Sequence, residues 1–220
     1  MADRWATFDC YGTLIDWNGG IRRELARLFG EESADELLAR YHELEPQIQA
    51  DEPTASYRDV MSRALESLAA EQDVELSPEE RDALGRSLPG WTPFPEVPES
   101  LEQARAGGFR LCILSNSDPD LIAASIARLG VQFDDAITAS EIGSYKPALG
   151  HWRTFEQRQG RLPDVHVAAS LFHDVGPAAE LGIPSVWVNR LAEARDGYEP
   201  TREIPDLDPL PRTLSELTAQ

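Results

Sequence analysis

The chain has 220 residues, of which 41% are hydrophobic, and a formal net charge of −19 at pH 7. This length suits one core domain with an inserted subdomain, and the acidic surface excludes nucleic acid and anionic membranes as expected partners. No apolar run reaches the roughly 18–20 residues that span a bilayer and the first residues lack a signal-peptide pattern, so we expect a cytoplasmic protein.

Short apolar runs recur along the chain, and helical patterns separate most of them. Strand and helix alternating in this way predict an α/β fold, a Rossmann-like parallel sheet with helices on both faces. The expected strands are WATFDC (5–10), FRLCILSNS (109–117), DAITAS (135–140), VHVAAS (165–170) and PSVWVN (184–189).

The stretch from residue 17 to residue 90 differs, because its periodicity is helical throughout. Its last predicted helix starts with Ser77 as the N-cap and Pro78 at the first helical position. A proline-rich linker, LPGWTPFPEVPES, follows. We therefore expect a core domain of residues 1–16 and 91–220 and an inserted helical cap subdomain of residues 17–90.

Polar residues stand at the ends of four predicted strands: Asp9, Ser115 with Asn116, Lys146, and Asp174. In open parallel sheets, ligands bind where the carboxyl ends of the strands meet. Lys146 is also the only lysine beside nineteen arginines, which indicates that its position needs an ammonium group. We expect these side chains to share one crevice.

The segments FDCYGTL, ILSNS, SYKP and SLFHD, in this order, closely resemble the four motifs of the haloacid dehalogenase-like hydrolase superfamily. The likeness extends over nearly the whole chain and implies that the helical insert is a mobile cap. Phosphatases of the superfamily carry a second aspartate where this chain has Tyr11, and another acid where it has Ser170. The resemblance therefore points to the branch that acts on 2-haloacids, with no metal ion or other cofactor.

That branch implies a role for each catalytic candidate. Asp9 would attack the carbon that bears the halogen and form an aspartyl ester, which water then hydrolyses. Lys146 would keep Asp9 ionised, Ser115 and Thr13 would position carboxylates, and Asp174 would orient Lys146 or activate the water. The substrate would be a small anionic 2-haloacid such as chloroacetate or 2-chloropropionate.

The resemblance also implies substrate-binding residues. Arg40, on the cap, would bind the leaving halide, with Arg58 as the competing candidate and Asn116 as a second donor. Tyr11, Trp152 and Ser170 would shape the rest of the substrate site.

Two departures leave other functions open. Trp152 stands where the branch has a tyrosine, and Leu171 stands where it has an asparagine. The alternatives are a magnesium-dependent phosphatase of the superfamily and a non-catalytic protein that keeps the fold. A homodimer through the apolar cap helices is a further expectation.

Overall fold

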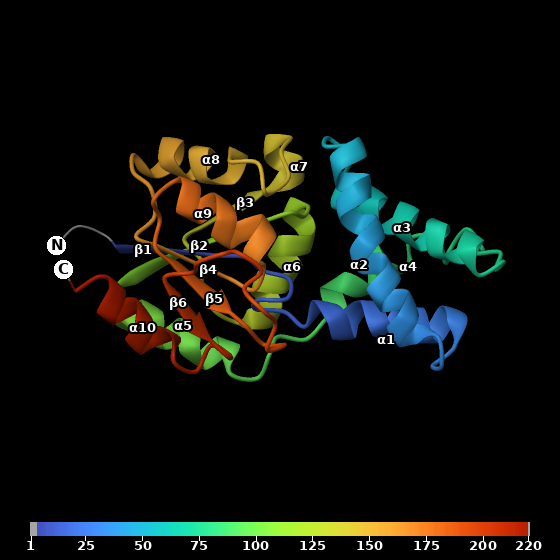
Figure 1. The fold of residues 1–220 in the computed structure, drawn as a ribbon, viewed down its shortest axis with the longest axis horizontal. Coiled ribbons are helices and arrows are strands. Elements are labelled where there is room, and N and C mark those ends of the chain that lie inside the picture. Colours follow the sequence, from blue (N-terminus) through green and yellow to red (C-terminus); the bar gives the residue numbers. More distant parts are fainter. Residues whose placement is uncertain (1–3, 220) are drawn as a thin grey trace.

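The computed structural model describes residues 4–219, which fold around a six-stranded sheet (Figure 1). The strands lie in the order β3-β2-β1-β4-β5-β6, and every neighbouring pair is parallel. Their bounds are β1 (Arg4–Phe8), β2 (Phe109–Ser115), β3 (Asp135–Thr138), β4 (Val165–Ala168), β5 (Ser185–Val188) and β6 (Arg202–Ile204). The first five confirm the predicted strands. The short edge strand β6 was not predicted, because it has three residues and two of them are exposed arginine and glutamate.

Helices cover both faces of the sheet, as the alternating pattern predicts. On one face, α5 (Val97–Ala106), α6 (Pro119–Leu129) and α10 (Leu210–Leu217) pack into a hydrophobic cluster with β1 and β2. On the other face, α8 (Gly150–Gln159) and α9 (Gly176–Glu180) enclose a second cluster around Trp5 and Trp152. Figure 1 shows α8 and α9 above the strands and α5 and α10 below them. The short helix α7 (Ala139–Ile142) leads from β3 towards α8.

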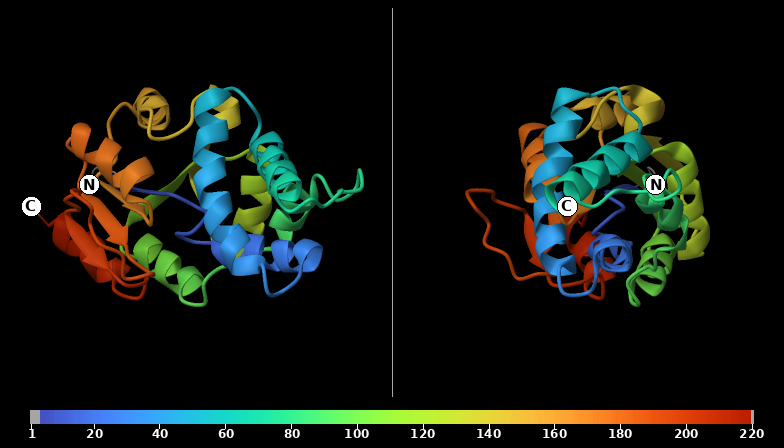
Figure 2. Two further views of the ribbon diagram at one scale, coloured as in Figure 1. Left: turned by 45° about the vertical axis from the view of Figure 1, so that its right-hand side comes forward. Right: turned by 90° about the vertical axis from the view of Figure 1, so that its right-hand side faces the viewer.

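Residues 17–90, which we call the cap, form a separate helical layer beyond the carboxyl end of the sheet (Figures 1 and 2). They comprise α1 (Trp17–Phe29), α2 (Ala34–Asp51), α3 (Tyr57–Glu71), α4 (Ala83–Ser87) and the 3-10 turn η1 (Leu88–Gly90). The prediction of a helix that starts at Ser77 was wrong. Residues 78–82 form turns, and α4 begins only at Ala83. The amide of Ser77 donates a hydrogen bond to the Glu80 carboxylate at 2.9 Å.

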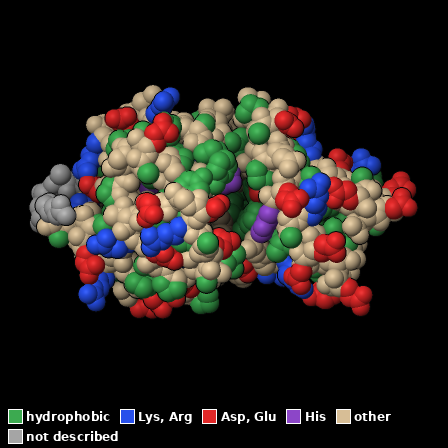
Figure 3. All heavy atoms as spheres, in the orientation of Figure 1, with side chains coloured by type: hydrophobic (Ala, Val, Ile, Leu, Met, Phe, Trp, Pro, Cys, Tyr) green, Lys and Arg blue, Asp and Glu red, His purple; other side chains and the backbone are tan. Residues whose placement is uncertain are grey.

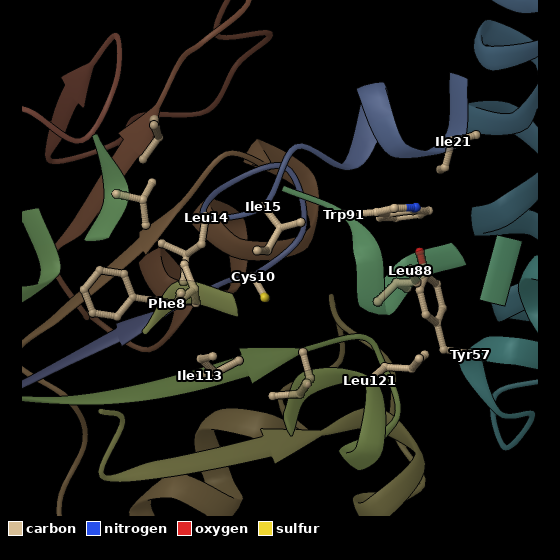
Figure 4. Packing of buried hydrophobic residues seen from close by; sticks show 14 of the residues in the cluster. Phe8, Cys10, Leu14, Ile15, Ile21, Tyr57, Leu88, Trp91, Ile113 and Leu121 are labelled. Carbon is tan, nitrogen blue, oxygen red and sulfur yellow. The ribbon is translucent and has the colours of Figure 1, made fainter. Parts of the chain in front are cut away.

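The hydrophobic core continues from the sheet into the cap, as the labelled side chains of Figure 4 show. Leu14 and Ile15 extend the packing of β1, and Trp91 and Tyr57 continue it on the cap side. Gly20 in α1 permits this contact, because a Cβ there would lie 2.3 Å from the Trp91 ring. The cap is therefore joined to the core by packed side chains as well as by its two chain connections.

A carboxylate of the core also caps a helix of the cap. Asp118, which is 5% exposed and precedes α6, accepts hydrogen bonds from the amides of Tyr57 and Arg58 at 2.9 and 3.1 Å. These are the first two residues of α3, where unpaired amides and the helix dipole favour a negative charge.

Among residues 4–219, the structure contains no helix with both the length and the apolar character that crossing a bilayer requires.

Candidate active site

A cavity of about 400 Å³ lies at the carboxyl ends of the strands, between the core and the cap. Figure 3 shows a hollow between the two parts, with histidine side chains at its edge. Its described lining includes several residues expected from the sequence, namely Asp9, Tyr11, Ser115, Asn116, Lys146, Ser170 and Asp174. The strand ends therefore converge as parallel-sheet topology requires.

Asp9 directly follows β1, and donors hold both oxygens of its carboxylate. Lys146 Nζ donates to Oδ1 at 2.9 Å, and Thr13 Oγ1 donates to Oδ2 at 2.7 Å. The Thr13 hydroxyl is fixed in turn by the amide of Ala169, which donates to it at 2.9 Å from the end of β4. The carboxylate thus has a defined orientation while it still lines the cavity.

Lys146 is 2% exposed, and each of its three ammonium hydrogens has an acceptor. Nζ donates to Asp9 at 2.9 Å, to Asp174 at 2.6 Å and to the carbonyl oxygen of Leu114 at 2.9 Å. Burial alone would lower the pKa of Lys146, but the charges of Asp174 and Asp9 raise it above its ordinary value. The ammonium group therefore stays charged and bridges the two carboxylates.

Asp174 lies in the π-helical turn η2 (Leu171–Val175) after β4 and is 1% exposed. Its Oδ1 accepts from Lys146 and, at 2.9 Å, from Nε2 of the buried His166. Burial would raise the pKa of Asp174, but the charge of Lys146 and the hydrogen bond from His166 hold it well below its usual range. Asp174 is therefore ionised at neutral pH.

The remaining polar residues at the strand ends support this arrangement. Asn116 fixes the backbone of Lys146, because its Oδ1 accepts from the Lys146 amide at 2.6 Å and its Nδ2 donates to the Lys146 carbonyl at 3.0 Å. The hydroxyl of Ser170 accepts from the amide of His173 at 3.1 Å. Ser115, at the end of β2, is 1% exposed and lines the cavity beside them.

Tyr11 lines the cavity with its ring stacked on Tyr57 of the cap, at a centroid distance of 6.2 Å and an interplanar angle of 16°. Its hydroxyl bonds to Ser125 Oγ at 3.0 Å. Burial raises the pKa of Tyr11 well above its ordinary value, so the phenol is neutral. At position 11, where a second carboxylate would add negative charge, the aromatic ring of Tyr11 lines the cavity instead.

Three residues expected at the substrate site lie elsewhere. Arg40 is on the outer face of α2, where it pairs with Glu43 and Glu71 at 2.7 and 2.8 Å. Arg58 pairs with Asp120 and donates to the Gly85 carbonyl at 2.9 Å. Neither arginine is among the described residues of the cavity lining.

Trp152 is also outside the cavity. It is fully buried in the cluster between α8 and the sheet, with its ring 5.3 Å from that of His166 at 74°. Its contact with the site is therefore indirect, through the partner of Asp174.

The sequence interpretation missed much of the cap wall. Trp17, His42, Glu45 and Gln49 of the cap line the cavity, as does Phe94 of the linker that follows the cap. The signal was present in α2, whose buried positions recur at helical spacing and include Glu45 and Gln49 among apolar residues. A polar residue on an otherwise apolar stripe indicates a cavity or a buried partner.

Arg190 is a further lining residue that was not expected. It follows β5 and donates to the Thr13 carbonyl at 2.9 Å, and it pairs with Glu96 at 2.7 Å. Its guanidinium carbon lies 3.7 Å from the centroid of the Phe94 ring. Arg190 thus connects the loop that carries Asp9 to the linker between cap and core.

The family model described as haloacid dehalogenase-like hydrolase matches residues 4–169. The chain belongs to this family of hydrolases.

Relatives and solved structures agree with this membership. An (S)-2-haloacid dehalogenase of Pseudomonas sp. (strain YL) is 27% identical over 218 residues, which cover 90% of this chain and 87% of the relative. The crystal structure of an L-2-haloacid dehalogenase superposes with a TM-score of 0.86 at 22% identity, and covers 98% of this chain and 100% of the other. A Xanthobacter autotrophicus L-2-haloacid dehalogenase with chloropropionic acid covalently bound gives a TM-score of 0.83 at 20% identity, with 96% and 98% covered.

Proposed function

We propose that this protein hydrolyses small 2-haloacids to 2-hydroxy acids and halide through an ester on Asp9, without a metal ion. Residues 1–16 and 91–220 would form the catalytic core and residues 17–90 its cap. The observation that carries the proposal is the buried ion pair between Asp9 and Lys146, both of which line the cavity between the core and the cap. The relatives that are (S)-2-haloacid dehalogenases support the substrate class.

In the first step, an oxygen of Asp9 forms a bond to the substrate carbon while the carbon–halogen bond breaks, and the halide leaves with the bonding electron pair. Halide needs no proton to leave, so an aromatic residue at position 11 is compatible with this chemistry. In the second step, water attacks the ester carbonyl, the carboxylate of Asp9 is restored, and one proton is released overall. Splitting the displacement in this way is nucleophilic catalysis.

The surrounding residues would each assist these two reaction steps. Lys146 offsets the charge of Asp9, and Thr13 fixes the carboxylate so that its attack has one direction. Asn116 holds the backbone of Lys146 in place. Asp174, ionised and also on the cavity wall, can accept a hydrogen bond from the hydrolytic water.

The metal ion that phosphatases of the family use is not part of this proposal. Among residues 4–219, no group of three or more His, Cys, Asp or Glu side chains is arranged to hold a metal ion. Asp9 and Asp174 instead share the ammonium group of Lys146. We expect EDTA to leave halide release from 2-chloropropionate unchanged.

A single-turnover reaction in water enriched in oxygen-18 tests the covalent step. With enzyme in excess over 2-chloropropionate, the label should enter the carboxylate of Asp9, because water attacks the ester carbonyl. Mass spectrometry of the peptide that contains Asp9 measures this. Label that appears directly in the hydroxy acid and not in the peptide would contradict the mechanism, and so would halide release by an Asp9→Asn variant. Magnesium-dependent release of phosphate from p-nitrophenyl phosphate, without halide release, would favour the phosphatase alternative.

A further inference from the structure

The cap wall of the cavity presents a carboxyl group to the site. Glu45 lies on α2 and is 9% exposed, on the same face of the helix as the fully buried Tyr41. It lines the same cavity as Asp9, so the two acids face the same space.

Glu45 is not balanced by a basic side chain in the part of the chain that the structure describes. The groups around it are Tyr41 and His42 on its own helix, Tyr57 on α3, Tyr145 after α7, and Asp9 after β1. His42 bonds to Asn18 at 3.0 Å.

The environment of Glu45 favours its neutral form. Burial raises the pKa of Glu45 to about 7. The hydrogen bond from Tyr57 lowers this pKa and the charge of Asp9 raises it. Glu45 can therefore exist as a carboxylic acid, a hydrogen-bond donor, near neutral pH.

The two cations of the described lining already have partners. Lys146 is shared by Asp9 and Asp174, and Arg190 pairs with Glu96. Five carboxyl groups line the same space: Asp9, Asp16, Glu45, Asp174 and Glu193. An anionic substrate that enters this cavity therefore meets more acidic than basic side chains, and an additional hydrogen-bond donor stabilises it, because an anion removed from water without a partner is costly.

We propose that Glu45 is a specificity-determining residue that admits a 2-haloacid only when its side chain is a neutral carboxylic acid, which donates a hydrogen bond to the carboxylate of the substrate. Ionised Glu45 repels the same carboxylate. This inference rests on the proposed function. A neutral analogue, a 2-haloamide, is not repelled by either form, so the ratio between acid and amide substrates changes with pH.

The test compares kcat/KM for halide release from 2-chloropropionate and from 2-chloropropionamide between about pH 5.5 and 8.5, a range in which the acid stays ionised. The ratio cancels the pH dependence of steps that both substrates share. In the wild type, the ratio of acid to amide should fall about tenfold per pH unit above about pH 7. In Glu45→Gln it should stay constant, because an amide donates a hydrogen bond without titrating. Glu43→Gln is the matched control, since Glu43 lies on the exposed face of the same helix, and it should behave like the wild type.

Binding of propionate, an unreactive anion, tests the inference without any variant. The dissociation constant should rise above about pH 7, and calorimetry in two buffers should show uptake of close to one proton per bound propionate near pH 8. A pH-independent dissociation constant, no binding at pH 6, or a wild-type substrate ratio that does not vary would overturn the role of Glu45. Absence of halide release from either substrate at every pH would instead overturn the proposed function, and propionate binding would still decide on Glu45.

Discussion

Replacing Lys146 by methionine is the most direct test of the central ion cluster. Methionine is close to lysine in length and removes only the ammonium group. The substitution leaves Asp9 and Asp174 buried together without the cation that bridges them at 2.9 and 2.6 Å. It also leaves the carbonyl oxygen of Leu114 without its bond from Nζ.

Removal of one partner from a buried ion pair typically destabilises a protein by about 3–5 kcal/mol, because the remaining charge is uncompensated. For a chain of this size, that corresponds to a decrease in melting temperature of about 6–20 °C. Urea unfolding followed by tryptophan fluorescence at pH 7 measures the free energy of unfolding. The loss should shrink as pH falls towards about 5, because Lys146 lowers the pKa of Asp174, which takes up a proton more readily once the lysine is absent.

Arg40→Met is the matched control, since Arg40 also joins two carboxylates but does so at the surface. Exposed pairs contribute little, so its effect should be much smaller. Adding Asp174→Asn to Lys146→Met should recover part of the lost stability by removing one unpaired charge. If Lys146→Met destabilises the protein no more than Arg40→Met at pH 7, the account of Lys146 as the cation that stabilises two buried carboxylates is wrong.

Three other substitutions test separate contacts. Thr13→Val should cost about 1–3 kcal/mol in urea unfolding, because it leaves Asp9 Oδ2 and a backbone amide unpaired in a buried place, and it should also slow halide release. Asp118→Ala should cost about 1 kcal/mol and increase hydrogen exchange in the first turn of α3, the helix that Asp118 caps; unchanged exchange there would argue against that role. The free energy of unfolding of Glu45→Gln, measured relative to that of the wild type, should rise by about 3 kcal/mol as the pH increases from about 4.5 to 7. The reason is that the pKa of Glu45 is raised from 4.5 to about 7, so the wild type loses stability as the pH rises through that interval. Parallel stability curves for the two proteins would refute this.

Strand ends were the most predictable part of the site. Buried apolar runs precede Asp9, Lys146 and Asp174. Because the carboxyl ends of parallel strands lie at the same edge of the sheet, these three side chains come together there. The sequence shows which residues stand at these ends. It does not show that all three ammonium hydrogens of Lys146 have acceptors. That fact depends on the loop after α7, whose backbone is held by Asn116.

The cap was less predictable, because residues on a helix change face every one or two positions. Arg40 and Tyr41 are neighbours in sequence, yet Arg40 pairs with surface glutamates and Tyr41 is fully buried. Helical period alone identifies the buried stripe of α2, with Leu37, Tyr41, Glu45 and Gln49, but not which part of the stripe meets the cavity. The resemblance to the haloacid branch therefore pointed to a residue of α2 whose side chain lies outside the described cavity lining.

Trp152 shows the same limitation in the core. The resemblance implies that the aromatic residue at this position lies at the substrate site, but α8 begins at Gly150 and turns its apolar side towards the sheet. The indole is consequently packed beside His166, and its influence on the site passes through that histidine.

His166 connects the interior of the sheet to the candidate nucleophile. Asp174 is ionised and can only accept, so the proton in its bond to His166 must be on Nε2. On its other side, the ring nitrogen Nδ1 lies 2.8 Å from Thr7 Oγ1, which fixes the plane of the imidazole within the sheet. Asp174 cannot rotate without losing this bond or the bond to Lys146, because both end on its Oδ1. The orientation of the ammonium group that Asp9 requires is therefore set by residues of β1 and β4, on the side of the site away from the cap.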